Sequence, residues 1–587
     1  MDGRNFNHPR KESVSSTQHE IEQSAPETGS KRPLWPVFGP AAGIIALVVI
    51  AAVIGGGGFS DALKTINTAV TASIGWYYVL IVTGFVLFAV VVAASPLGRI
   101  RLGADDDEPE YGTLSWISML FAAGMGIGLV FWGAAEPLNH LANPRPDVAE
   151  AGAPAIAQRA MTQTLLHWGV HAWAIYAVVG LGVAYAVHRR RRPISIRWAL
   201  EPLLGKRIVQ GPVGHAIDVA AIVGTLFGVA SSLGLGVTQM SAGLQSLGIL
   251  PDNEMVQLVL VVAITAIATF SVLSGLDKGI KWLSNFNMVL AALLVLAVLA
   301  LGPTLFVLRE FVQSIGSYAQ QFVGLSFSTL PYYGASGEEW LGSWTTYYWG
   351  WWMAWAPFVG VFIARISKGR TVREFVVGVL VVPTLLTTAW FSIIGGTALY
   401  QQVTNGGLIT DGSVSTNEAL FSVLDRLPGG ALLGGVAVLL VLVFFVTSSD
   451  SGSFVVDMIS HGGNQHPPVW SRVFWATMEG LIAAVLLWAG YRAGSASGGL
   501  NSLQTMAIIA AAPFSVVMIL ICISLWKALS RDVRRVRAVE SRIFRREVTL
   551  EVAEALESES PAGSHAARNG KPDQQSPRPA PPGGSLR

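Results

Sequence analysis

Apolar segments recur along the chain from residue 35 to residue 526, and each is about 20 residues long, the length that crosses a bilayer as a helix. Only 13% of the residues are charged and 52% are hydrophobic, whereas soluble domains are usually about 25% charged. The pattern predicts an all-α membrane protein with twelve transmembrane helices. The predicted spans are 35–55, 75–95, 115–135, 162–187, 215–240, 255–273, 287–308, 345–366, 374–400, 431–456, 470–490 and 503–526.

Basic residues are concentrated in every second loop between these segments. Loops on the cytoplasmic side of a membrane carry the excess of lysine and arginine. The alternation therefore predicts that both termini are cytoplasmic. The basic loops contain Arg99 and Arg101; residues 189–192 with Arg197; Lys278 and Lys281; Arg365, Lys368, Arg370 and Arg373; and Arg472.

Three polar segments lie outside the predicted spans. Residues 1–34 form an N-terminal cytoplasmic tail, and the amphipathic segment 311–329 predicts a helix lying in the membrane interface. Residues 527–587 form a C-terminal tail that is basic over 527–546, then acidic, then rich in proline, glycine and serine, a composition typical of disorder. The basic part can bind anionic lipid or can serve only to fix the topology.

The third predicted span contains alternating glycines in the stretch FAAGMGIGLVFWGAAEP, residues 121–137. Gly124, Gly126 and Gly128 weaken the helix and let another group approach the backbone closely. Glycine-interrupted spans point to the binding site of a transporter. The alternative is close packing of helices through small residues.

Aromatic residues gather near the middle of two predicted spans, where tryptophan is unusual because it normally lies near the membrane surface. Leucine would pack against lipid without an N–H to satisfy, whereas ring faces attract quaternary ammonium groups by about 2 kcal/mol each when desolvated. We therefore predict a cage for such a cation, with aromatic core packing as the alternative. The residues are Trp168, Trp173 and Tyr176 in the fourth span and Trp349, Trp351, Trp352 and Trp355 in the eighth.

The tenth span ends in a cluster of oxygen-bearing side chains, residues 447–451, in the stretch VTSSDSGS. Such oxygens suit sodium, although hydroxyls in helices often bond their own backbone instead. Asp450 should reach the interface or pair with a base, and Arg365 is a possible partner. Glu136 and Asp218, near other span ends, are interpreted as structural or gating residues.

Nothing in the sequence predicts an enzyme, a phosphate-binding loop, a nucleic-acid partner or a cofactor. The single cysteine, Cys522, cannot form an intrachain disulfide. His167 and His171 are four residues apart beside Trp168, but a structural role is more common for such a pair than a metal site.

Six motifs together resemble the betaine–carnitine–choline transporter family from the first span to the twelfth. They are AGMGIGLVFWGAAEPL, HWGVHAWAIYA, FGVASSLGLG, SGLDKGIKWLSNFN, YYWGWWMAWAPFVGVFIARISKGRTVREF and VTSSDSGS. The resemblance implies a bacterial cytoplasmic-membrane protein with two peripheral helices (35–95) followed by two inverted five-helix repeats, 115–308 and 345–526, as in sodium symporters of the LeuT type. It also implies a homotrimer, with segment 311–329 near the subunit contacts.

The resemblance also assigns site residues. The central box for a trimethylammonium group would be Trp168, Trp173, Tyr176 and Trp352, with Trp355 as a second substrate contact and Trp349 and Trp351 along the access route. One sodium site would use the backbone of Ala122 and Met125 and the hydroxyls of Thr447 and Ser448. A second would use Thr225, Phe358 and a hydroxyl at position 229, where this chain has Val229.

Gly128 matches the betaine-type version of the family's glycine motif. We therefore expect sodium-driven import of glycine betaine or a related compatible solute as an osmoprotectant, regulated osmotically through the charged C-terminal segment. Choline, carnitine, ectoine, proline and dimethylsulfoniopropionate remain alternative substrates. A passive osmosensitive channel is the alternative from another class of protein.

Overall fold

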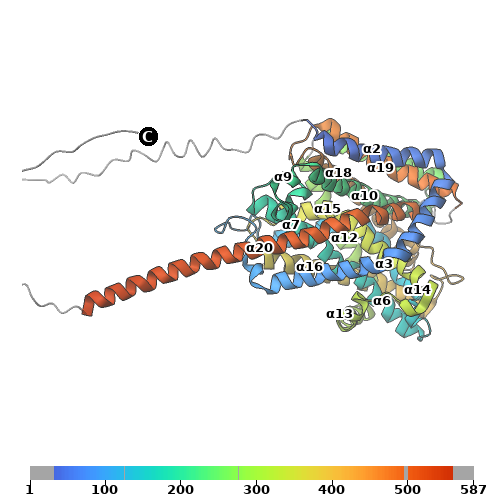
Figure 1. Ribbon diagram of the computed structural model, residues 1–587. Helices are drawn as coiled ribbons and strands as arrows, with labels where there is room; N and C mark the ends of the chain where they lie inside the picture. Colours follow the sequence, from blue (N-terminus) through green and yellow to red (C-terminus); the bar gives the residue numbers. More distant parts are fainter. Residues whose placement is uncertain (1–31, 125, 275–276, 495–499, 560–587) are drawn as a thin grey trace, which may run out of the picture. The chain divides into compact units, whose positions relative to one another are not determined.

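The computed structural model describes residues 32–124, 126–274, 277–494 and 500–559 (Figure 1). Regular structure within these residues is helical, apart from isolated bridges that join Arg101 to Thr371 and Thr410 to Ser413. Ten helical segments of the described residues, with Ala153–Arg189 counted as one, are long and apolar enough to cross a membrane. The prediction of an all-α membrane protein is therefore confirmed, whereas the count of twelve spans stays a prediction.

The helices before the middle of the chain are α2 (Trp35–Gly55), α3 (Gly57–Ala94), α4 (Thr113–Gly124), α5 (Ile127–Ala142), α6 (Ala153–Trp168), α7 (Val170–Ala184), α8 (Glu201–Leu204), α9 (Lys206–Val209), α10 (Pro212–Ser246), α11 (Glu254–Ser274) and α12 (Asp277–Leu301). Those that follow are α13 (Thr304–Ser326), α14 (Gly334–Leu341), α15 (Tyr347–Arg365), α16 (Val372–Asn405), α17 (Ala419–Asp425), α18 (Gly430–Ser460), α19 (Val469–Arg492) and α20 (Leu500–Glu559).

The two predicted spans outside the ten long apolar helices are the third and the eighth. The third is divided into α4 and α5, each too short to cross alone. The eighth corresponds to α15, whose tryptophans and tyrosines make it less hydropathic than an ordinary span. The glycines that divide the third span and the aromatic residues that lower the hydropathy of the eighth are the same residues that the sequence predicts for the site.

Helix packing in the unit that ends at Arg531 has a paired pattern. Helix α5 packs on α16 and α7 packs on α15, while α10 packs on α18 and α11 on α19. Helices α5, α7, α10 and α11 belong to the third to sixth spans, and α15, α16, α18 and α19 belong to the eighth to eleventh in the same order. If each span of the first set is exchanged with its counterpart in the second, the α5–α16 pair becomes the α15–α7 pair. The α10–α18 and α11–α19 pairs are each converted into themselves. Two repeats of one fold would produce this pattern, so it supports the predicted repeats. In Figure 1, α10, α15 and α18 lie close together within this unit.

The peripheral elements differ from the sequence prediction mainly at their ends. Helix α2 packs on α10 and α19, and α3 packs on α7 and α16. The amphipathic helix α13 begins at Thr304 instead of residue 311 and packs on α6 and α16. The seventh span ends at Leu301, because Gly302 and Pro303 separate it from α13.

The basic C-terminal segment is helical, since α20 runs without interruption from Leu500 to Glu559. Residues from Asp532 onward form a second compact unit, and the side chains of residues 534–556 are exposed. Most of the N-terminal tail and the Pro/Gly/Ser-rich C-terminal tail, residues 1–31 and 560–587, lie outside the described residues.

Candidate functional site

The helix of the third span is interrupted where its glycines alternate. Helix α4 ends at Gly124, α5 begins at Ile127, and Gly126 between them has an extended backbone. A Cβ atom on Gly128 would lie 2.6 Å from Cη2 of Trp351 and 3.1 Å from Cη2 of Trp168. The missing side chain therefore lets two indoles reach the backbone of α5.

A second interruption divides the fourth span at Gly169, between α6 and α7. A Cβ there would lie 2.5 Å from the carbonyl oxygen of Leu165 and 2.8 Å from the hydroxyl of Tyr318, so only glycine fits. The break frees the carbonyl of His167, which accepts a hydrogen bond of 2.9 Å from Nε1 of Trp352. This break was not predicted from the sequence, although a glycine between two aromatic-rich turns was its signal.

The four residues predicted for the central box form one connected set of rings. The Trp168 and Trp352 rings lie 4.9 Å apart at 72°. Tyr176 lies 6.2 Å from Trp352 at 74°, and Trp173 lies 5.6 Å from Tyr176 at 83°. Such edge-to-face contacts are favoured between aromatic rings. The structure therefore brings the predicted box together from α6, α7 and α15.

The other tryptophans of α15 divide between two sides of the helix. Trp351 stacks on Trp352, with centroids 4.6 Å apart, and contacts Trp355 at 6.4 Å. Trp349 instead stacks on His171 at 5.4 Å. Trp351 and Trp355 therefore extend the box, whereas Trp349 lies against α7, away from the box.

The box lies between two cavities at opposite ends of α15. One, of about 830 Å³, is lined by Tyr347 at the start of the helix, and the other, of about 780 Å³, by Phe362 and Arg365 at its end. Trp168 and Trp352 are only 5% and 4% exposed. Because the rings touch one another, a ligand can enter the box from either cavity only if rings move.

The buried carboxylate of Glu136 is hydrogen-bonded to one ring of the box. Oε2 of Glu136 accepts hydrogen bonds from Nε1 of Trp168, at 2.7 Å, and from the hydroxyl of Tyr348. Its Oε1 is bonded to Nδ1 of His167 at 2.7 Å and to Nε2 of His140 at 3.3 Å. Four hydrogen bonds are what an ionised carboxylate needs when it is taken out of water. The sequence interpretation of Glu136 as a structural or gating residue overlooked this link to the box.

His167 and His171 do not form a pair. His167 joins Glu136 and His140, and these three residues offer ligand atoms within 4.8 Å of one another. The hydrogen bonds to Glu136 account for this grouping without a metal ion. His171 is buried against Phe322 and Trp349, in agreement with the expected structural role.

Of the residues predicted for the first sodium site, Ala122 lies on α4 and Thr447 and Ser448 lie on α18. The hydroxyl of Thr447 donates to the carbonyl of Val443 at 2.9 Å, which leaves its oxygen lone pairs available to a cation. Thr447 and Ser448 are half-buried. Ala122 belongs to α4, whereas Met125 lies outside the described residues. The bond from Thr447 to its own helix is also what the alternative to a sodium site predicts, so the sodium site stays a prediction.

The second predicted sodium site is altered. The hydroxyl of Thr225 is buried and has no hydrogen-bond partner among the described residues, which suits a cation ligand. Phe358 contacts Trp355, 5.6 Å away. Val229 instead packs on Gly452, close to the buried carboxylate of Glu479, which accepts a hydrogen bond from Ser449 at 3.0 Å. A carboxylate therefore lies beside the position where the family pattern has a hydroxyl.

Two further acidic residues are paired. Asp450 lies 3.3 Å from Nη2 of Arg472, so the suggested partner Arg365 is wrong. The reason is geometric, because Arg365 and Arg472 both lie over the ring of Phe454 but Arg472 reaches the carboxylate. Asp218 accepts hydrogen bonds from Ser195 and the backbone of Arg197, as a structural residue would.

Comparison with known proteins decides the family. The model of the betaine/carnitine/choline family transporters matches residues 36–534. The chain belongs to this family. Its relatives are transporters, so the expectation that it is not an enzyme is confirmed.

Several relatives of this betaine/carnitine/choline (BCCT) transporter align over most of their length. An uncharacterized transporter of Mycobacterium tuberculosis (strain ATCC 25618 / H37Rv) is 51% identical, over 84% of this chain and 82% of the relative. The glycine betaine transporter OpuD of Bacillus subtilis is 45% identical, over 85% and 95%. A glycine betaine/proline/choline/ectoine transporter of Vibrio parahaemolyticus is 40% identical, over 90% and 93%.

Substituting Gly128 by alanine should reduce transport by roughly tenfold, because the added methyl group pushes Trp351 and Trp168 out of their positions at a cost of about 1–3 kcal/mol. Gly84 of α3 is the matched control, since a Cβ there meets nothing within 4 Å. Initial uptake rates of the two variants, normalised to the amount of protein in the membrane, test this expectation. Equal rates for Gly128→Ala and Gly84→Ala would show that the glycine contact is dispensable.

Proposed function

We propose that this BCCT transporter imports glycine betaine, or a related quaternary-ammonium solute, together with sodium. The observation that carries the proposal is the box of Trp168, Trp352, Tyr176 and Trp173 with Glu136 hydrogen-bonded behind it. A trimethylammonium group has no N–H donors, so ring faces and a nearby negative charge are the partners that recognise it. Trp355 and Trp351, next to the box, provide further contacts for the substrate.

The buried carboxylate strengthens the box by its charge. Glu136 accepts the N–H of Trp168, and its negative charge raises the electron density of that indole. In a site that excludes water, charges act more strongly than in solvent. Cationic headgroups are therefore favoured over neutral solutes, and the substrates in the name of the Vibrio relative (glycine betaine, proline, choline and ectoine) are the solutes to test.

The two cavities provide the alternate routes of access. We assign the cavity at Arg365 and Lys368 to the cytoplasm, because these residues belong to the basic loops, and the cavity at Tyr347 to the outside. Asp61, Glu338 and Glu339 line the outer cavity with a single lysine, Lys64, which suits the approach of a cation. Both termini are then cytoplasmic.

Sodium supplies the free energy for accumulation by moving down its own gradient. Thr447 and Ser448, with the backbone of Ala122 and Met125, would hold one ion, and Thr225 and Phe358 belong to the second site. Because Val229 offers no oxygen, we assign the main coupling role to the first site. Thr447→Ala should raise the sodium concentration that half-saturates uptake.

Assembly and regulation follow from the family resemblance. We propose a homotrimer in a bacterial cytoplasmic membrane, with α13 near the subunit contacts. The exposed basic side chains of residues 534–546 suit binding to anionic lipid, which would make the C-terminal helix an osmotic regulator. Chemical cross-linking and uptake by vesicles that lack anionic lipid test these two points.

Uptake of radiolabelled glycine betaine into proteoliposomes tests the function. We expect accumulation above the outside concentration when sodium is present outside, and none when potassium replaces it. Accumulation also excludes a passive channel, which can only equalise concentrations. Uptake that does not change on removal of sodium would refute the coupling but not the substrate, and competition by choline, carnitine, ectoine and proline defines the specificity.

A further inference from the structure

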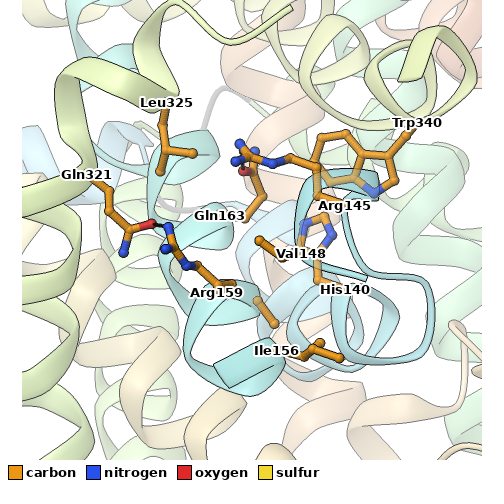
Figure 2. Close-up of a pocket in the computed structure, with 10 residues that line it drawn as sticks. His140, Arg145, Val148, Ile156, Arg159, Gln163, Gln321, Leu325 and Trp340 are labelled. Atoms are coloured by element: carbon orange, nitrogen blue, oxygen red, sulfur yellow. Dashed lines mark hydrogen bonds between the residues drawn. The ribbon is translucent and has the colours of Figure 1, made fainter. Parts of the chain in front are cut away.

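Among the three partners Glu136, His140 and His167, one nitrogen atom has no hydrogen-bond partner among the described residues. It is Nδ1 of His140, whereas Nε2 of the same ring is bonded to Glu136. Figure 2 shows His140 among the residues that line a small pocket. The pocket holds about 10 Å³, room for a single water molecule. The free nitrogen therefore lies where a proton can be delivered by water.

His167 has no such free position. Its Nδ1 is bonded to Glu136, and its Nε2 lies 2.9 Å from the amide nitrogen of Gln163 and 3.1 Å from the hydroxyl of Thr345. The neutral ring with its proton on Nδ1 satisfies all three contacts. A second proton on Nε2 would face the amide N–H of Gln163, so the geometry favours His140 as the residue that gains a proton.

The surroundings of His140 contribute few other charges. Arg145 lines the pocket and is paired with Asp147. From α6, Arg159 is bonded to Gln321 of α13, whose other residue in the pocket, Leu325, is apolar. From α15, Tyr348 donates to Glu136, and from α14 the Trp340 ring lies 5.5 Å from His140. Glu136 is thus the charge that a protonated His140 would face most directly.

We propose that His140 binds a proton from the pocket of Figure 2, and that this proton competes with the positive charge of the substrate for Glu136. The proposal rests on the proposed cation-binding function of the box. An imidazolium at 3.3 Å neutralises the carboxylate, so the box attracts a cation less strongly. Acidification then weakens substrate binding, and substrate binding releases the proton.

Binding of glycine betaine to the purified full-length protein, measured by tryptophan fluorescence in the presence of EDTA, tests the competition. Between about pH 7.5 and about pH 5.5 we expect the Kd of the unmodified protein to rise roughly three- to tenfold. In His140→Asn the ratio of the two Kd values should fall below about twofold. His171→Asn is the matched control, because His171 is equally buried but contacts Trp349 and Phe322 instead of Glu136.

A titration without substrate tests the proton directly. The His140 ring lies 4.3 Å from that of Trp344, so its protonation should quench the fluorescence of that tryptophan. We expect a quenching step in the unmodified protein and in His171→Asn, and none in His140→Asn. A step that persists in His140→Asn, or a pH dependence of the Kd that His140→Asn retains, overturns the proposal.

Two other outcomes separate the proposal from its alternatives. If the pH effect appears only without EDTA, the group binds a metal ion instead of a proton, which overturns the proposal. If the protein does not bind glycine betaine at about pH 7.5, the proposed substrate is wrong, and the titration without substrate still decides whether His140 takes up a proton.

Discussion

Replacing Trp352 by alanine should abolish measurable accumulation of glycine betaine. The substitution removes a ring of the box, worth about 2 kcal/mol of cation attraction, and the N–H that binds the carbonyl of His167, worth about 1 kcal/mol. Together these losses correspond to a Kd that is higher by roughly two orders of magnitude. Binding measured by isothermal titration calorimetry and uptake into proteoliposomes should both show the loss.

Two further variants separate the causes of this effect. Trp352→Phe keeps a ring face without the N–H, so it should retain most of the affinity while transport is slower. Trp475→Ala removes an equally buried indole of α19, whose N–H is bonded to Ser460, outside the box. It should lower thermal stability without changing the Kd. If Trp352→Ala binds glycine betaine as tightly as Trp475→Ala does, the box is not the binding site.

Replacing Glu136 by glutamine should reduce uptake at least tenfold for cationic and zwitterionic solutes. Glutamine preserves the volume but removes the charge, and its amide N–H₂ faces groups that themselves donate. Each buried donor left without an acceptor costs about 1–3 kcal/mol, so Trp168 and Tyr348 lose their fixed orientation. Initial uptake rates and the Kd, compared at equal amounts of folded protein, provide the measurement.

The matched control for Glu136→Gln is Glu310→Gln. Glu310 of α13 accepts a hydrogen bond from Ser314 at 2.7 Å and does not contact the box. Its substitution should leave the Kd unchanged. Uptake by Glu136→Gln within about twofold of the unmodified protein would mean that the rings alone recognise the substrate.

Sequence reasoning gives the fold class and the aromatic residues of the fourth and eighth spans because both depend on local patterns, whereas the grouping of four of these residues into one box came from the family resemblance. Apolar length defines the spans, and the three-residue spacing of Trp173 and Tyr176, with Trp168 eight residues before Tyr176, predicts that their rings lie on one broad side of the fourth span. The alternating glycines likewise mark the break between α4 and α5. These inferences need no knowledge of how distant helices pack.

The features that the sequence did not predict depend on contacts between distant segments. Glu136 stands near the end of a span, and only the packing of α5 against α6 and α15 shows that it holds Trp168 and Tyr348. The choice of Arg472 over Arg365 as the partner of Asp450 depends on the approach of α19 to α18. The position of Glu479 close to Val229 is a third feature of this kind. Neither residue alone predicts that a carboxylate lies near the second sodium site.

The hydrogen bond from Trp352 to the carbonyl of His167 connects a side chain of the box to the break between α6 and α7 at Gly169. If this indole turns to make room for a ligand, it releases a carbonyl beside the break between α6 and α7. The ring thus holds α15 against the break between α6 and α7. Entry of a ligand into the box and loss of this contact between α15 and α6 would then be one event, and a solute too small to displace the ring would leave the contact in place.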